Sequence, residues 1–179
     1  MEDTHVKSLK PVFALATALL MAGCSAGQIT QTSDQVAAVD GANVETENGE
    51  LAVQDVTVVL DETGSAALKF SALNQDTSMT SHSLRSVSVD GTPVSIESSK
   101  EIGYNCVLVG DSAAGLDRMP QDDGKNCIEY IRTALPNDSF AYGGTVPVTF
   151  TFDTGTLEVN APVSAPLLPS GQVHRDLNK

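Results

Sequence analysis

VPVTFTFDTGTLEVNAPV, residues 146–163, is the stretch that most clearly specifies the fold of this chain. Apolar and polar residues alternate on both sides of a turn at Asp153-Thr154-Gly155. The alternating apolar residues are Val146, Val148, Phe150 and Phe152 before the turn, and Leu157, Val159, Ala161 and Val163 after it. Side chains alternate between the two faces of a strand, so each set lies on one face. The stretch therefore predicts a hairpin with one buried face.

Similar short runs, rich in Val, Ile, Thr and Phe, precede this hairpin and are separated by turn residues. They are residues 51–60, 66–73, 84–89, 93–96, 102–109 and 127–135. The alternation changes phase at Gln54-Asp55, which indicates a bulge, and Asp90-Gly91 predicts a second hairpin. Because no window has a helical period, we expect an all-β domain. Its seven to nine strands predict an antiparallel β-sandwich of the immunoglobulin-like kind.

The N-terminal region has the layout of an export signal. An apolar run at residues 12–22 follows Lys7 and Lys10, and ends in small residues before Cys24. The run is too short to cross a bilayer, which needs roughly 20 helical residues. The small residues before the cysteine resemble the bacterial lipobox. That resemblance implies removal of residues 1–23 and attachment of acyl chains, such as palmitate, to Cys24. The alternative is an ordinary signal peptide or anchor with Cys24 as an incidental thiol.

Composition divides the remaining chain into three parts. Residues 24–50 are rich in Ser, Thr, Gln, Asn and Gly and predict a lipidated flexible tether. Residues 51–164 would form the β-sandwich domain. Residues 165–179 contain two prolines and end in polar residues, which predicts a disordered tail.

The charge of the chain limits its partners. It has 23 acidic and 10 basic residues, a formal net charge of −13. A chain this acidic repels phosphate backbones, so we expect no nucleic-acid partner. It also lacks a polybasic patch for anionic lipids, so its membrane contact would come from the N-terminal lipid.

If Cys24 carries lipid, Cys106 and Cys127 remain as a pair. Cysteine pairs in exported proteins form disulfides, and the spacing excludes a Cys-x-x-Cys redox motif. We expect a structural disulfide that stabilises the fold by roughly 3 kcal/mol.

Several segments together resemble the LpqE-like lipoproteins of actinobacteria, within the larger PCu(A)C copper-chaperone family. They are the Cys24 lipobox, GQITQT at 27–32, QVAAVDG at 35–41, LAVQDV at 51–56, AALKFSALN at 66–74 and the hairpin residues 146–159. The resemblance implies a cupredoxin-like β-sandwich.

The family resemblance does not bring the copper ligands with it. Copper chaperones of this kind resemble one another in a His–Met pair, a further Met and a His-x-Met, which are ligands suited to Cu(I). Residues 92–98 and 127–142 contain neither His nor Met. Met79, His82 and Met119 are the weak candidates for a diverged ligand set. No other cofactor is expected.

The other possible chemistries have weak signals. A Ser-His-acid triad needs a placed histidine, and only His82 lies within the predicted domain. Oxygen ligands for calcium crowd one loop, namely Asp117, Asp122, Asp123, Asn126 and Glu129.

We therefore predict a non-enzymatic, lipid-anchored protein of the cell membrane or envelope surface. It would bind an envelope protein through sandwich loops or an edge strand. The alternative is a periplasmic copper chaperone with a diverged Met/His ligand set.

Overall fold

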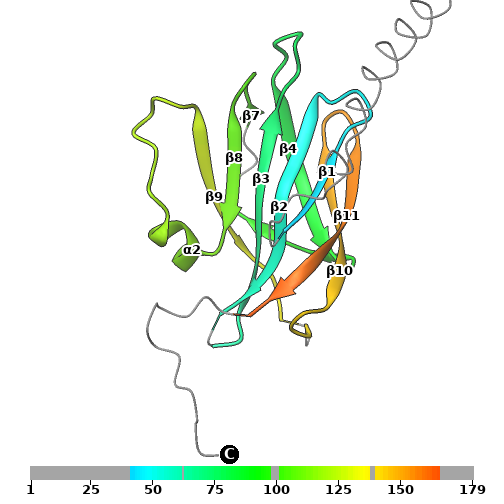
Figure 1. Cartoon of the computed structure of the whole chain (residues 1–179), viewed down its shortest axis with the longest axis vertical. Coiled ribbons are helices and arrows are strands. Elements are labelled where there is room, and N and C mark those ends of the chain that lie inside the picture. The colour runs from blue at the N-terminus through cyan, green and yellow to red at the C-terminus, as the bar shows by residue number, and fades with distance from the viewer. Residues whose placement is uncertain (1–40, 62, 98–100, 138–139, 166–179) are drawn as a thin grey trace, which may run out of the picture. The chain divides into compact units, whose positions relative to one another are not determined.

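The structure is a computed structural model that describes residues 41–61, 63–97, 101–137 and 140–165 (Figure 1). The predicted signal peptide at 1–23, Cys24, the tether up to residue 40 and the tail from residue 166 lie outside the described residues. Among the described residues, no helix has the length and apolar character needed to span a membrane.

The described part of the chain is built mainly from strands. In order they are β1 Ala42–Glu45, β2 Leu51–Leu60, β3 Ala66–Asn74, β4 His82–Val89, β5 Thr92–Pro93, β6 Ser95–Ile96, β7 Glu101–Ile102, β8 Val107–Asp111, β9 Ile128–Ala134, β10 Thr145–Phe152 and β11 Thr156–Ser164. The short helix α2, Ala113–Arg118, lies between β8 and β9. The expected all-β class is confirmed.

The strands form a nearly closed sheet in the order β5-β4-β10-β11-β2-β3-β8-β9-β6. β1 pairs with β2, and β7 pairs with β4, outside this path. Figure 1 shows β8, β9 and α2 on one side of β2 and β3, and β10 and β11 on the other. The segment from β4 to β6 joins the two ends of the path, because β5 pairs with β4 and β6 pairs with β9.

The sheet is mixed, so the expected antiparallel sandwich is not confirmed. β11 runs parallel to β2, and β8 runs parallel to β9. The sequence pattern reports which face of a strand is buried and carries no information on the direction of its neighbour. The β8–β9 connection is long enough for a parallel crossover, which needs a dozen or more residues.

The bulge expected at Gln54-Asp55 is present. The β2–β3 register shifts between Gln54 and Thr57, and Asp55 has a φ of 56°. Its backbone amide donates to Asn43 Oδ1 (2.9 Å), and its carboxylate pairs with Lys69 Nζ (2.6 Å). The bulge is therefore held from both neighbouring strands.

Both predicted hairpins are confirmed. β4 and β5 are joined by Asp90 and Gly91, which have φ values of 48° and 78°. Positive φ at both central residues is the geometry that Asp-Gly turns favour in two-residue hairpins. β10 and β11 pair from Thr145↔Pro162 to Thr151↔Thr156 around the predicted turn.

The alternating apolar residues form the core. Leu68, Phe70 and Ala72 of β3 are buried, as are Val148, Phe150 and Phe152 of β10. The rings of Phe70 and Phe150 meet edge to face, with centroids 5.1 Å apart. Because β3 and β10 are not neighbours in the sheet, this contact spans the interior of the domain.

The folded part begins before residue 51, the predicted start of the domain. β1 pairs antiparallel with β2 through Val44↔Val53 and Glu45↔Ala52, and the turn between them contains Gly49 at a φ of 70°. Residues 42–45 belong to the predicted tether, where scattered apolar residues gave no clear strand pattern.

A short helix, α2, lies in the segment between the predicted strands 102–109 and 127–135. The Ser112 side chain caps α2 by accepting a hydrogen bond from the Gly115 amide (3.0 Å). Six residues are too few to establish a helical period, so the pattern could not reveal this turn.

Cys106 and Cys127 form the expected disulfide, with their Cα atoms 5.0 Å apart. Each precedes the first residue of its strand, and Val107 pairs with Ile128 in the β8–β9 register. The disulfide therefore fixes the two parallel strands at their common start.

Candidate functional site

A groove of about 940 Å³ lies where β2 ends and β3 begins, bordered by β6, β8, β9 and α2. We call it the α2 groove. Its apolar lining includes Leu60, Ala66, Ala67, Ile96, Ala114 and Met119. The strands supply a rigid floor, and the exposed Ala113 and Ala114 of α2 form one wall.

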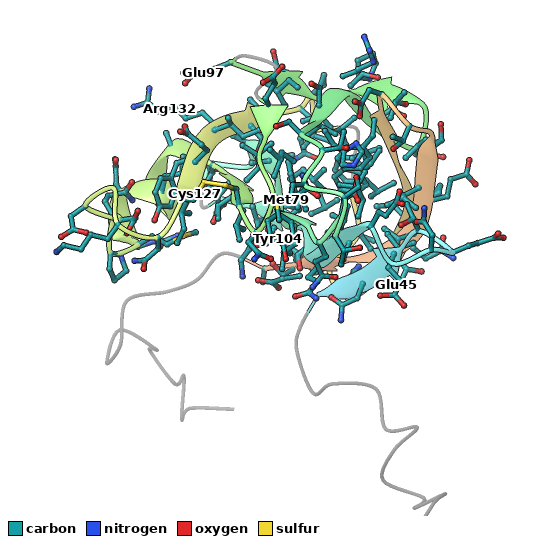
Figure 2. The ribbon with its side chains drawn as sticks, turned by 90° about the horizontal axis from the view of Figure 1, so that it is seen from above. Glu45, Met79, Glu97, Tyr104, Cys127 and Arg132 are labelled. Atoms are coloured by element: carbon teal, nitrogen blue, oxygen red, sulfur yellow. A yellow bond between two sulfur atoms is a disulfide. The ribbon has the colours of Figure 1, made fainter. Side chains whose placement is uncertain are left out.

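Charged side chains also line the α2 groove. Arg132 Nη1 lies 3.5 Å from Glu97 Oε1, and Figure 2 shows both residues at one edge of the domain. Both side chains are more than half exposed, so this ion pair adds little stability. Lys69 and Arg118 are the other cationic residues of the lining.

Asp111 is the buried acid of this groove. Burial raises the pKa of its carboxyl, although hydrogen bonds from Ser112 and the charges of Lys69 and Arg118 oppose the rise. The Ser112 amide donates to Asp111 Oδ1 (2.6 Å). A Cβ on Gly115 would lie 2.3 Å from the Asp111 carboxyl carbon, so only glycine fits where α2 meets β8.

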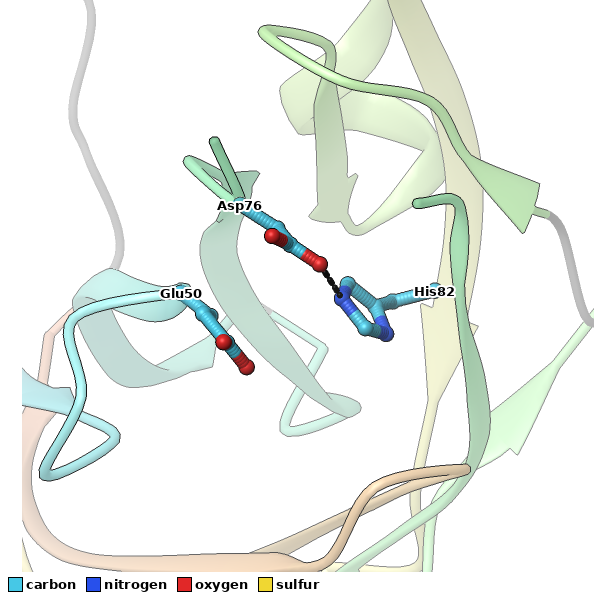
Figure 3. Close-up of side chains that lie close together, drawn as sticks. All are labelled: Glu50, Asp76 and His82. Atoms are coloured by element: carbon cyan, nitrogen blue, oxygen red, sulfur yellow. Dashed lines mark hydrogen bonds and ion pairs between the residues drawn. The ribbon is translucent and has the colours of Figure 1, made fainter. Parts of the chain in front are cut away.

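A second candidate site lies at the other end of the β2–β3 hairpin. Glu50 immediately precedes β2, Asp76 follows β3, and His82 begins β4. One ligand atom from each of these residues lies within 4.8 Å of the other two (Figure 3). We call this group the Glu50–Asp76–His82 cluster.

Hydrogen bonds fix Asp76 in this cluster. Its amide donates to Asn74 Oδ1 (3.0 Å), and its Oδ1 accepts from the Ser78 amide (2.8 Å). Hydrogen bonds from the Ser78 hydroxyl and amide, with a smaller contribution from His82, lower the pKa of the Asp76 carboxyl. Its Oδ2 lies 3.1 Å from His82 Nε2, so the two groups share a hydrogen bond.

His82 is buried, with only 3% of its surface exposed. Its Nδ1 has no hydrogen-bond partner among the described residues and lies 3.6 Å from Asp153 Oδ1. That oxygen accepts a hydrogen bond from the Ser83 amide (3.0 Å). A buried nitrogen without a partner is costly, because it loses its hydration and receives nothing in return.

The structure does not gather the three weak copper candidates. Met79 lies on a turn at a φ of 62°, with 73% of its surface exposed. Met119 lines the α2 groove together with Leu60 and Ala66, which pair at the end of β2–β3 remote from Glu50. His82 has carboxylates around it in place of thioethers.

One of the acids weighed as calcium ligands, Asp122, has a structural role. Asp122 accepts hydrogen bonds from Gly124 and from the amide and side chain of Asn126, so its carboxylate closes the turn before β9. Asp117 lies on α2 and does not take part in this turn.

Sequence reasoning identified His82 but missed its two acidic neighbours. Glu50 falls within the predicted tether, and Asp76 falls between the predicted strands 66–73 and 84–89. The only sequence signal is that Glu50 and Asp76 each lie next to the end of a predicted strand. This position becomes informative once the strand pairing is known.

Comparison with known proteins adds one relative. The chain is 31% identical over 167 residues to the protein named "Putative lipoprotein LpqE" from Mycobacterium leprae (strain TN). The match covers 88% of this chain and 88% of the relative. No family model matches the chain.

Proposed function

The chain belongs to the family of LpqE-like lipoproteins, and from this premise we propose a lipid-anchored, non-enzymatic binding module of the cell envelope. Its folded domain would hold an envelope protein in the α2 groove. The groove is the observation that carries the binding role, because it combines an apolar floor with charged residues at its edge.

Two features support an exported, anchored protein. Residues 12–24 have the order of a signal that ends in a lipid-modified cysteine. The Cys106–Cys127 disulfide suits an oxidising compartment outside the cytosol. A lipid on Cys24 would then be the membrane attachment.

Mass spectrometry of the native protein tests the anchor. We expect a mature chain that starts at Cys24 and carries acyl groups, and a Cys24→Ala variant that leaves the membrane fraction. A control Cys106→Ser/Cys127→Ser variant should remain in the membrane fraction, because it keeps Cys24. An unmodified thiol at Cys24 in membrane-bound protein would contradict the proposal.

Site-specific photo-crosslinking tests the groove. A photoreactive residue at Ala114, on the wall of the α2 groove, should capture one discrete envelope protein in intact cells. The same residue at exposed Glu158 of β11 is the matched control and should not. Addition of Ala67→Arg, which fills the floor, should abolish the Ala114 crosslink. Identical crosslinks from both positions, or crosslinks that survive the filled groove, would contradict the binding role.

A copper chaperone with a diverged ligand set is the second candidate. It is favoured by the buried His82, whose imidazole has an unpartnered nitrogen, and by the exposed Met79 three residues before it in the sequence. Titration with Cu(I) of the wild type and of a Met79→Leu/His82→Gln/Met119→Leu variant tests it. Binding that is unchanged by the triple substitution would end this candidate.

We also infer a distant relationship to the PCu(A)C family and its cupredoxin-like sandwich. The closing β10–β11 hairpin, with its alternating core residues, supports this inference. An experimental structure superposed on a copper chaperone of that family would test it through the order and direction of the strands.

A further inference from the structure

We propose that Glu50, Asp76 and His82 bind one divalent transition-metal ion, with Zn²⁺ as the best match to their donor atoms. This inference is independent of the lipid anchor and of the α2 groove, since the cluster lies at the opposite end of the β2–β3 hairpin.

The spacing of the donor atoms fits a small ion. Zn²⁺ binds histidine nitrogen and carboxylate oxygen at about 2.0–2.2 Å, so tetrahedral ligand atoms stand roughly 3.3–3.5 Å apart. Asp76 Oδ2 and His82 Nε2 are already 3.1 Å apart. The Glu50 carboxylate, within 4.8 Å of both, needs to approach by only about 1–1.5 Å to complete this spacing.

Glu50 is available for this approach. Figure 3 shows its side chain directed toward the Asp76–His82 pair. Its backbone is fixed, because its carbonyl accepts from the Gln75 amide (2.7 Å) and its amide donates to Asn48 Oδ1 (3.3 Å). Its carboxylate has no hydrogen bond or ion pair within the described part of the chain. A half-buried carboxylate that is directed toward a histidine, and is not held by another described side chain, can turn toward a bound ion.

The unpartnered Nδ1 of His82 is the second, independent observation. When Nε2 binds a metal, the ring proton resides on Nδ1, which then needs an acceptor. Asp153 Oδ1 lies 3.6 Å away and is held in place by the Ser83 amide. At zinc sites, a carboxylate commonly accepts the other ring N–H of a metal-binding histidine and so fixes the orientation of the ring. Without metal, Nε2 shares a hydrogen bond with Asp76, and Nδ1 has no hydrogen-bond partner among the described residues.

Charge selects a divalent ion. Two carboxylates and a neutral imidazole carry a charge of −2, and no lysine or arginine forms an ion pair with them among the described residues. Oxygen and imidazole donors suit Zn²⁺, whereas Cu(I) prefers sulfur. The nearest methionine in sequence, Met79, is 73% exposed.

Calorimetric titration of the mature full-length protein with Zn²⁺, without a polyhistidine tag, tests the site. We expect one ion per chain, and proton release on binding because the metal replaces the Nε2 proton. Glu50→Gln is the decisive variant, because the carboxylate it alters makes no contact that the fold needs. It should weaken binding by roughly 10-fold to 100-fold, with an unchanged circular-dichroism spectrum.

Three controls sharpen the result. Glu45→Gln changes an exposed glutamate on β1 and should leave binding unchanged. His174→Ala removes the tail histidine as a competing ligand and should also have no effect. Met79→Leu separates this site from a sulfur-ligated copper site and should not alter Zn²⁺ binding.

Co²⁺ provides a spectroscopic test of the same ligands. The Co²⁺ complex should show visible absorption that disappears in Asp76→Asn and His82→Gln. Zinc binding that is equally tight in wild type and Glu50→Gln, or no binding of Zn²⁺ or Co²⁺ at all, would overturn the proposal. Loss of Zn²⁺ binding in Met79→Leu would also overturn it, in favour of the sulfur-containing set.

Discussion

Cys106 and Cys127 are joined immediately before the first paired residues of two parallel strands, β8 and β9. The strands cannot be linked by a tight turn because both run in the same direction, so the chain crosses over through α2. The disulfide closes this crossover, with a sequence separation of 21 residues.

Loss of the disulfide should lower the stability of the domain. A Cys106→Ser/Cys127→Ser variant should have a free energy of unfolding about 3 kcal/mol below that of the wild type, because the unfolded chain regains the entropy of the opened loop. Urea unfolding by circular dichroism measures this difference. Reductant should lower the stability of the wild type by a similar amount and leave the variant unchanged. Equal stability of the wild type and the variant, each with and without reductant, would show that the disulfide does not constrain the unfolded chain.

The Phe70–Phe150 contact should carry a large part of the core stability. Phe150→Ala should reduce the free energy of unfolding by about 3–5 kcal/mol, because it opens a cavity between β3 and β10. Tyr142→Ala is the matched control, since Tyr142 is 60% exposed. Its effect should stay within about 0.5 kcal/mol. Similar losses in the two variants would contradict the burial pattern.

Gly115 should resist substitution although it lies in a helix. Alanine normally stabilises a helix by about 1 kcal/mol relative to glycine. Gly115→Ala should instead destabilise the protein by about 1–3 kcal/mol, because its Cβ displaces the buried Asp111 carboxyl. Thermal unfolding, with Ala114→Ser as the exposed control, measures the effect. A gain in stability for Gly115→Ala would contradict the close approach of α2 to β8.

Asp111 and Asp61 should shape the pH dependence of stability in opposite ways. Burial raises the pKa of Asp111 in the folded protein. Its favourable contribution to the free energy of unfolding is therefore present below the unfolded pKa of about 3.9, and it is lost as the pH rises through the folded pKa. Asp111→Asn cannot ionise. Its stability relative to the wild type should therefore increase with pH across that window, as urea unfolding between pH 3 and 7 would show.

Hydrogen bonds from the Thr63 hydroxyl, and further ones from Ser65 and the Thr63 amide, lower the pKa of Asp61. Its contribution is present above about pH 3.9 and is lost as pH falls through the folded pKa. The advantage of the wild type over Asp61→Asn should therefore shrink on acidification. A difference between these two proteins that does not change from pH 2 to 5 would contradict the turn geometry.

Features that depend on neighbouring residues could be predicted from the sequence. The buried faces of β3, β10 and β11 follow from alternation, the bulge at Asp55 from a change of phase, and the β4–β5 turn from Asp90-Gly91. In each case, the physical cause lies within a few residues, where side-chain size and turn chemistry act directly.

Features set by tertiary packing could not be predicted in this way. The parallel direction of β8 and β9 depends on how the crossover returns to the sheet, and α2 is too short to produce a period. The Glu50–Asp76–His82 cluster combines residues from three strand ends that meet only when β2, β3 and β4 have assembled. His82 could be proposed by its residue type, but its partners could not.

The sheet path ends in β5 and β6, which are two residues each. Strands of this length leave few backbone groups open to a neighbouring molecule, and extended edges are what drives proteins to polymerise. Copies confined to two dimensions by a lipid would meet far more often than copies in free solution. If the proposed lipid anchor holds the domain at a membrane, the brevity of β5 and β6 would allow dense display there without the formation of fibrils.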